Sequence, residues 1–239
     1  MAFSKYMPTI ADNLHHVYRQ IHTAADKAGR HPEEIQLLAV SKGQPASALR
    51  ECFQLGQRHF GENYLQEALD KQTALADLGD IHWHFIGPIQ ANKTRKVAEQ
   101  FDWVHSIDRQ RIAERLSAQR PEHCQPLNIC IQVNIDDEDS KSGVTPLEVE
   151  ALARAIISLP NLTLRGLMCI PRSSDDPAEQ RHAFSTLASL LRQLQDSTHL
   201  PTLDTLSMGM TNDLESAIQE GATIVRIGTA IFGARQTHP

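Results

Sequence analysis

Two patterns of apolar and polar residues alternate along the chain. Short runs of consecutive apolar residues are typical of strands buried on both faces, and apolar residues that recur every three or four positions are typical of amphipathic helices. The runs predict strands at 37–40, at the start of 59–63, and at 83–86, 103–105, 128–133, 164–170, 205–208 and 223–227. The recurring pattern predicts helices at 45–55, 64–75, 93–101, 108–118 (capped by Asp108), 146–159, 184–194, 214–218 and 230–233, and an extra one with Ile10, Leu14, Val17 and Ile21 on one face.

Strands that alternate with helices favour a parallel sheet, because each helix returns the chain to the same end of the sheet. Eight such repeats predict a closed α/β structure, the (β/α)8 TIM barrel, preceded here by one extra N-terminal helix; an open doubly wound sheet is the alternative. Barrels of this kind commonly take about 250 residues, close to the 239 of this chain. Since no Gly/Ser-rich linker interrupts the pattern, we expect a single domain over residues 1–239.

Composition narrows the classes of function. Apolar residues make up 41% of the chain and charged residues 22%, which is ordinary for a globular protein. The net charge of -6 argues against a general nucleic-acid binder, since such proteins present a basic face. We find no secretory signal, and no apolar run approaches the roughly 18 residues of a membrane span. Four scattered cysteines without a C-x-x-C pair indicate reduced core residues, so we expect a cytoplasmic protein that binds neither nucleic acid nor membrane.

Lys42 follows the first predicted strand and is a candidate for covalent chemistry. The carboxyl ends of the strands carry the site in α/β barrels, and strand 37–40 ends just before Ser41 and Lys42. An amine partly withdrawn from water has a lowered pKa, and a neutral lysine amine attacks an aldehyde to form a Schiff base. The alternative is an ordinary loop lysine that reaches solvent.

The exits of the last two predicted strands have the composition of an anion site. Residues 207–213 and 226–229 supply hydroxyls, glycines and the starts of helices, which together make a phosphate cradle where barrels often hold phosphate. Ordinary turn chemistry, with Asn212 or Asp213 as a helix cap, is the alternative. Arg226 lies on the last strand itself, where a charge needs a partner. That partner is either a carboxylate or the ring nitrogen of pyridoxal 5'-phosphate (PLP), which recurrently pairs with an Asp or an Arg.

Six motifs together resemble those of a known family. They are LAVSK at 38–42, FGENY at 60–64, WHFIGPIQANK at 83–93, SKSG at 140–143, LSMGM at 206–210 and VRIGTAIFG at 225–233. In this order they closely resemble the pyridoxal phosphate homeostasis protein family, whose members look like the barrel domain of alanine racemase without its second domain. The resemblance implies the same barrel, with PLP as the cofactor.

The resemblance also implies a role for seven residues. Lys42 would hold PLP as a Schiff base, Arg226 would face the pyridine nitrogen, and Asn63 would lie near the ring. The phosphate would be held by Ser207, Gly228 and Thr229, with Thr211 as a second candidate for that role. One departure from the family pattern is Gly43-Gln44, where many members carry Thr and a basic residue. It leaves the Schiff base untouched but changes the electrostatics of the cavity mouth.

Whether such a site catalyses a reaction depends on the arginine. An arginine stays protonated, so the ring nitrogen it faces remains unprotonated and the ring is a weaker electron sink. The resemblance agrees: it implies a monomeric carrier or regulator in vitamin B6 homeostasis, without established turnover and with apo-PLP enzymes as candidate recipients. The alternative is a PLP-dependent amino-acid racemase or lyase, in which Tyr64 or a histidine supplies the second base.

Three further patterns are weaker. His82 and His84 share one face of a strand but lack a third metal ligand. The acidic run 136–139 lacks the spaced glycine and distal glutamate of an EF-hand loop. The basic segment 92–96 is better explained by a solvent-facing helix than by contact with phosphate or RNA. We therefore predict no metal site.

Overall fold

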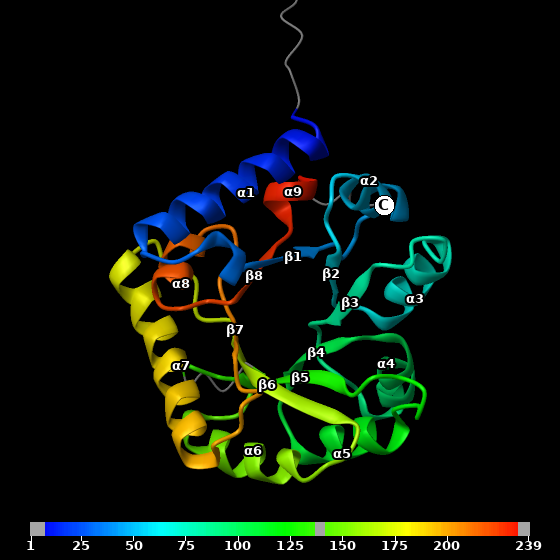
Figure 1. The fold of residues 1–239 in the computed structure, drawn as a ribbon, viewed down its shortest axis with the longest axis vertical. Helices are drawn as coiled ribbons and strands as arrows, with labels where there is room; N and C mark the ends of the chain where they lie inside the picture. Colours follow the sequence, from blue (N-terminus) through cyan, green and yellow to red (C-terminus); the bar gives the residue numbers. More distant parts are fainter. Residues whose placement is uncertain (1–7, 137–141, 234–239) are drawn as a thin grey trace, which may run out of the picture.

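The chain closes into a barrel of parallel strands (Figure 1). The computed structural model describes residues 8–136 and 142–233. Its strands pair in chain order, and the first also pairs with the last, which confirms the (β/α)8 barrel and excludes the open sheet. The strands are β1 (Gln36–Val40), β2 (His59–Glu62), β3 (His82–Phe85), β4 (Trp103–Ile107), β5 (Leu127–Val133), β6 (Leu162–Cys169), β7 (Thr205–Ser207) and β8 (Ile224–Ile227).

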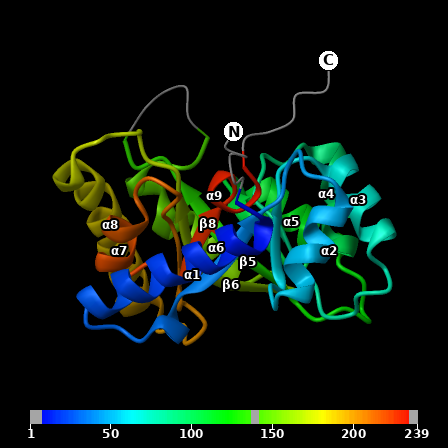
Figure 2. The ribbon, with the colours of Figure 1, turned by 90° about the horizontal axis from the view of Figure 1, so that it is seen from above.

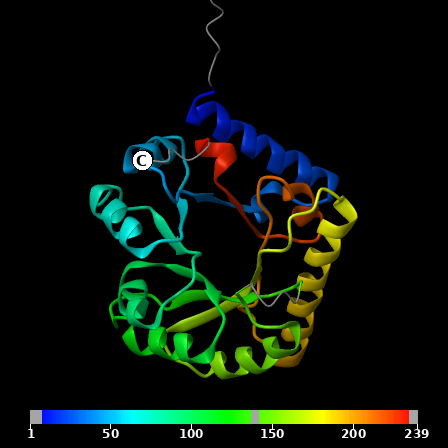
Figure 3. The ribbon, with the colours of Figure 1, turned by 180° about the vertical axis from the view of Figure 1, so that it is seen from behind.

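Helices follow the strands and form a ring around the barrel, which Figures 2 and 3 show from above and from behind. They are α2 (Ala46–Gln54), α3 (Leu65–Ala74), α4 (Thr94–Gln100), α5 (Gln110–Gln119), α6 (Val149–Ile157), α7 (Pro177–Thr198), α8 (Leu214–Gln219) and α9 (Thr229–Phe232), with short 3-10 turns at η1 (Pro32–Glu34), η2 (Ala91–Lys93) and η3 (Pro146–Glu148). Within the described ranges, no helix combines the length and apolar character needed to cross a bilayer.

The predicted extra helix is α1 (Ile10–Lys27), which lies against α8, α9 and α2 where the ring of helices closes (Figure 1). Polar contacts fasten it there. Asn13 donates a hydrogen bond to the carbonyl oxygen of Ile231 at 3.0 Å, and Nη1 of Arg30 donates to the carbonyl oxygen of Ala222 at 2.8 Å. Its buried face carries the residues whose spacing predicted the helix, Leu14, Val17 and Ile21.

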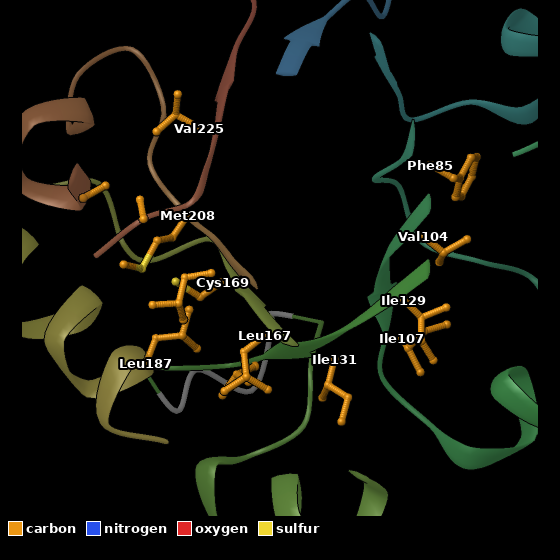
Figure 4. Close-up of a cluster of buried hydrophobic side chains, with 14 of the residues drawn as sticks. Phe85, Val104, Ile107, Ile129, Ile131, Leu167, Cys169, Leu187, Met208 and Val225 are labelled. Carbon is orange, nitrogen blue, oxygen red and sulfur yellow. The ribbon is translucent and has the colours of Figure 1, made fainter. Parts of the chain in front are cut away.

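Apolar side chains form two layers. The larger layer lies between strands and helices, and Figure 4 shows part of it, with Leu187 from α7 and Leu167 and Ile131 from the strands. The smaller layer has members from five strands that are spread around the ring, and these can meet only inside the barrel: Leu38, Trp103, Cys130, Met168 and Ile224. Buried polar groups share this interior, since the ring of His84 stacks on Trp103 with centroids 5.4 Å apart.

One predicted helix start is wrong. Asp108 does not cap α5, because β4 runs two residues beyond the predicted 103–105 and the helix begins only at Gln110. The extension occurs because Ser106 and Ile107 stay buried and Ile107 pairs with Ile131 of β5. The residue before the helix is Arg109, whose side chain makes no capping bond, and Asp108 instead lies 3.5 Å from its Nε as an ion pair.

Gly166 on β6 provides a test of strand packing. It pairs with Thr205 of β7, and a Cβ atom at Gly166 would lie 1.8 Å from the carbonyl oxygen of Thr205. We expect Gly166→Ala to force the two strands apart and to lower the free energy of unfolding by about 2–4 kcal/mol. Urea denaturation measures the change.

Gly79→Ala is the matched control, because nothing lies within 4 Å of a Cβ at that position. It is expected to change the free energy of unfolding by less than about 1 kcal/mol. Equal stability of the two variants would contradict the close approach of β6 and β7.

Candidate functional site

A cavity of about 330 Å³ opens at the carboxyl ends of the strands. Its lining comes from β1, β2, β3, β6, β7 and β8 or the segments that follow them, so the loops converge as the barrel rule predicts. Six of the seven predicted site residues line it: Lys42, Asn63, Thr211, Arg226, Gly228 and Thr229. The seventh, Ser207, does not.

Arg226 reaches the cavity from β8 and is only 5% exposed. Nη1 donates to the carbonyl oxygen of Ser207 at 2.6 Å and to its Oγ at 2.9 Å, and Nη2 donates to the carbonyl oxygen of Cys169 at 2.8 Å. A guanidinium has five N–H donors. In the described part of the chain, the Nε–H and one Nη2–H find no acceptor, and no carboxylate forms an ion pair with Arg226. The carboxylate partner that the sequence left open is therefore not found.

The protonation state of Arg226 depends on its burial and on the high intrinsic pKa of a guanidinium. Burial lowers the pKa of Arg226, but a guanidinium starts so high that it stays protonated. The result is a fixed positive charge in the wall of the cavity, with two N–H donors that no acceptor among the described residues takes. Such a group favours a ligand that accepts hydrogen bonds.

Ser207 is the last residue of β7 and is fully buried. Its Oγ accepts a hydrogen bond from Arg226 and lies 2.8 Å from Nδ1 of His105. The hydroxyl thus supports the arginine from within the barrel and is not at the cavity surface. Its position does not fit the predicted phosphate role, whereas Thr211, the other predicted hydroxyl on this loop, lines the cavity.

A tight turn directly after β1 carries Lys42. The N–H of Gln44 donates to the carbonyl oxygen of Ser41 at 3.0 Å and closes the turn. Gly43 has a φ of +73°, a conformation that glycine adopts without steric cost. The departure from the family pattern at this position therefore suits the turn that directs Lys42 to the cavity.

Behind this turn lies a buried ionic group, the Lys71 cluster, formed by Lys71, Glu62 and Glu67. Nζ of Lys71 donates to Oε1 of Glu62 at 2.7 Å, to Oε1 of Glu67 at 2.6 Å and to the carbonyl oxygen of Ser41 at 2.6 Å. Oγ of Ser41 donates to Glu62 at 2.6 Å, and the N–H of Gly43 donates to Glu67 at 2.5 Å. The residues on both sides of the cavity lysine are therefore held by this cluster.

The members of the Lys71 cluster depend on one another. Lys71 is 4% exposed and Glu62 is fully buried. Burial raises the pKa of Glu62, while the charge of Lys71 and its hydrogen bond oppose the rise. A buried charge without a partner is strongly destabilising. Removal of Lys71 would leave both carboxylates without their ion pair, and removal of either carboxylate would leave Lys71 with one. None of the three was predicted as part of a site, although Glu67 and Lys71 stand four residues apart in a predicted helix.

The wall formed by β8 has the features of an anion cradle. A Cβ at Gly228 would lie 2.9 Å from the carbonyl oxygen of Val40, so glycine lets the exits of β8 and β1 approach closely. Thr229 then begins α9, whose first amides have no acceptor within the helix. Across the cavity, Oδ1 of Asn63 is buried without a hydrogen-bond partner in the structure. The lining thus combines donors suited to an anion with an unsatisfied acceptor.

Five polar residues of the lining were not predicted as site residues: Ser173, Ser174, Gln180, Asn212 and Asp213. Ser173 and Ser174 come from the connection between β6 and α7, a polar loop after a predicted strand that the barrel rule could have indicated, and Gln180 lies in the first turn of α7. Asp213 was predicted only as a cap, yet its side chain makes no capping bond to α8. Its Oδ1 accepts from the N–H of Met210, and burial raises its pKa.

The predicted second bases lie elsewhere. Tyr64 is 59% exposed and precedes α3 without lining the cavity. Among the described residues, no histidine lines it either, since His84 and His105 are buried inside the barrel. The structure therefore does not bring Tyr64 or a histidine to Lys42.

No residue of the basic segment 92–96 lines the cavity. Residues 137–141, which include most of the acidic run and the start of the SKSG motif, lie outside the described residues. The basic segment 92–96 forms the end of η2 and the start of α4. Throughout 8–136 and 142–233, no group of three or more metal-ligating side chains could hold a metal ion.

Comparison with known proteins gives the family. A family model described as the N-terminal domain of alanine racemase matches residues 12–236. The pyridoxal phosphate homeostasis protein of Pseudomonas aeruginosa is 58% identical over 96% of this chain and 97% of its own length. The protein of the same name from Escherichia coli K12 is 53% identical over 96% of this chain and 98% of its own. The chain belongs to the pyridoxal phosphate homeostasis protein family. The resemblance carried by its motifs is thereby confirmed.

Solved structures share the barrel of this family member. PipY of Synechococcus elongatus, in a structure with PLP bound, superposes with a TM-score of 0.83 and 38% identity, covering 94% of this chain and all of that chain. Alanine racemase from Corynebacterium glutamicum gives a TM-score of 0.71 at 18% identity, with 94% of this chain matched to 62% of that one. The second likeness shows the fold alone.

The Lys71 cluster can be tested through Glu67. Glu67→Ala removes the acceptor of the Gly43 N–H and one of the three acceptors of Lys71. We expect the free energy of unfolding to fall by about 1–3 kcal/mol, because the buried amine of Lys71 loses an acceptor and the turn loses the bond at Gly43. Glu67→Gln keeps an acceptor oxygen and should lose less than Glu67→Ala in the same denaturation experiment.

Glu150→Ala is the control, because its bond to Arg154 is an exposed i,i+4 pair on α6. Such a pair contributes only about 0.3–0.5 kcal/mol. If Glu67→Ala were no more destabilising than Glu150→Ala, the cluster would not hold the lysine turn.

Proposed function

We propose that this protein binds PLP through a Schiff base at Lys42 and acts in intracellular PLP homeostasis as a carrier or regulator. One observation carries the proposal: the same cavity brings together Lys42 and a buried arginine that has two N–H donors for which the described residues supply no acceptor. The PLP-bound relative PipY, 38% identical over 94% of this chain, supports PLP as the ligand. The names of the relatives from Pseudomonas aeruginosa and Escherichia coli support the homeostatic role.

The cavity residues have complementary tasks in this proposal. Lys42 would hold PLP through a reversible carbon–nitrogen double bond to its aldehyde carbon, with loss of water. The Nε–H and remaining Nη2–H of Arg226 would donate toward the pyridine nitrogen. The amides after Gly228 and the hydroxyls of Thr211 and Thr229 would hold the phosphate, and Asn63 would lie beside the ring.

The same arginine argues against efficient turnover. Bound PLP supplies an electron sink for carbanion chemistry, and that sink is strongest when the ring nitrogen is protonated. A guanidinium donates to the nitrogen without giving up its proton, so it leaves the ring less able to accept electrons. A carrier that releases PLP to apoenzymes in the cytoplasm, acting as a monomer, fits this chemistry.

A PLP-dependent racemase or lyase is the second candidate. The observation that favours it is Asp213, a carboxyl group with a raised pKa that lines the same cavity as Lys42. A second base is what racemisation requires in addition to the lysine. Neither Tyr64 nor any histidine of the described residues lines the cavity, so this candidate depends on Asp213.

Borohydride reduction tests the covalent bond. After incubation with PLP and reduction, we expect the intact mass to rise by one reduced PLP group and peptide mapping to place that group on Lys42. Lys42→Ala should lose the label, whereas Lys93→Ala, an exposed lysine outside the cavity, should keep it. A label on another residue, or no label, would overturn the assignment.

Hydrogen exchange separates the two candidate functions. The PLP-loaded protein is incubated in deuterated water with single L-amino acids, and the α-carbon is followed by NMR. We expect no exchange, and transfer of PLP to an apoenzyme in a parallel assay. Exchange or turnover that is lost in Asp213→Asn would instead establish the enzyme.

A further inference from the structure

A line of hydrogen-bonded side chains crosses the barrel interior beneath the cavity. It is the histidine file, formed by His59 of β2, His84 of β3 and His105 of β4. Nδ1 of His59 lies 3.0 Å from Nε2 of His84, and Nδ1 of His84 lies 2.9 Å from Nε2 of His105. Nδ1 of His105 lies 2.8 Å from Oγ of Ser207, which accepts from Arg226. The file therefore ends at the cavity arginine.

The file runs between the two ends of the barrel. His59 is the first residue of β2 and lies at the amino ends of the strands, where its ring stacks on the exposed His82 with centroids 4.6 Å apart. Ser207 and Arg226 lie at the carboxyl ends. His84 and His105 between them are fully buried. No aliphatic side chain could make the bonds that these rings make.

The three imidazoles are neutral. Burial lowers the pKa of His105 to about 3, with the nearby Arg226 charge as a second cause. Burial also lowers the pKa of His59 to about 4 and that of His84 well below its usual value. A neutral imidazole has one N–H and one bare nitrogen, so each ring in the file must donate on one side and accept on the other.

Arg226 sets the direction of the file. Arg226 donates to Oγ of Ser207, so the Ser207 hydroxyl is free to donate its own hydrogen. The acceptor within reach is Nδ1 of His105. His105 then carries its hydrogen on Nε2 and donates to His84, and His84 likewise donates to His59. The reverse order would leave the Ser207 hydrogen buried without a partner and would point an N–H toward the guanidinium charge.

We propose that His105 and His84, with Ser207, are positioning residues for Arg226 in one directed hydrogen-bond file, with every ring in the Nε2–H form. One Nη1 hydrogen of Arg226 goes to the Ser207 hydroxyl of the file and the other to the Ser207 carbonyl oxygen. The Nε–H side of the guanidinium then faces the cavity. The file also connects the cavity arginine to His59 at the opposite face. The directed file is a property of the protein without PLP, so the proposal goes beyond ligand binding.

Histidine NMR tests the direction of the file. The ligand-free protein, labelled with nitrogen-15 at histidine, is studied near neutral pH by long-range nitrogen–proton correlation, which distinguishes the two tautomers. We expect His59, His84 and His105 all to be in the Nε2–H form. An Nδ1–H form at any of the three would overturn the proposal, whether or not the protein binds PLP.

The guanidinium signals test the positioning of Arg226. In the wild-type protein the Nη1 protons of Arg226 should be resolved and protected from solvent exchange. Ser207→Ala removes one of their two acceptors and is expected to raise the exchange rate about tenfold. Ser106→Ala is the control, because that buried hydroxyl donates to the Gly87 carbonyl and takes no part in the file.

Unchanged Arg226 exchange in Ser207→Ala, or equal effects of the two substitutions, would reject a positioning role. If Ser207→Ala fails to fold, His84→Gln serves in its place, since His84 lies three hydrogen bonds from Arg226 and its substitution breaks the file without touching the guanidinium. The expected result is loss of the fixed tautomer at His59. A His59 tautomer that survives the substitution would contradict a continuous file.

Discussion

A permanent positive charge inside the barrel, the guanidinium of Arg226, is the constraint on which the site depends. Water reaches little of it, and the Ser207 and Cys169 carbonyls together with a serine hydroxyl supply three acceptors. Burial, with this charge as the second cause, lowers the pKa of His105 and keeps it neutral. The barrel interior therefore holds buried polar groups beside a small apolar layer.

The cavity has two supports that differ in chemistry. On the β8 side, neutral rings and hydroxyls surround a single charge. On the β1 side, the lysine turn rests on a compact set of opposite charges, in which Lys71 contacts two carboxylates and the Ser41 carbonyl. Both supports lie behind the residues that contact the cavity, and both restrict side-chain or backbone freedom before any ligand arrives. Preorganisation of this kind lowers the entropy that binding must offset.

Local sequence patterns predicted most of the fold and the cavity wall. Each strand is recognisable within a few residues, and the rule that sites lie at the carboxyl ends placed Lys42, Arg226 and Gly228 together. The position of Ser207 could not be read from its motif, because only the bond to Arg226 on another strand shows that its hydroxyl lies outside the cavity lining. The Lys71 cluster and the histidine file were not predicted, since their partners lie on different strands and helices. The available signals for the cluster were local: Glu62 at the end of a predicted strand, and the four-residue spacing of Glu67 and Lys71 in a predicted helix.

The pairing of β1 with β8 has a consequence for synthesis of the chain. Lys42 and Arg226 flank this seam, yet almost the whole described sequence separates them. A chain emerging from the ribosome exposes the lysine turn early, while the opposite wall does not yet exist. The chain therefore acquires high affinity for a small ligand only when β8 pairs with β1. A ligand present at that stage would stabilise the closed barrel and would not stabilise chains whose barrel is still open.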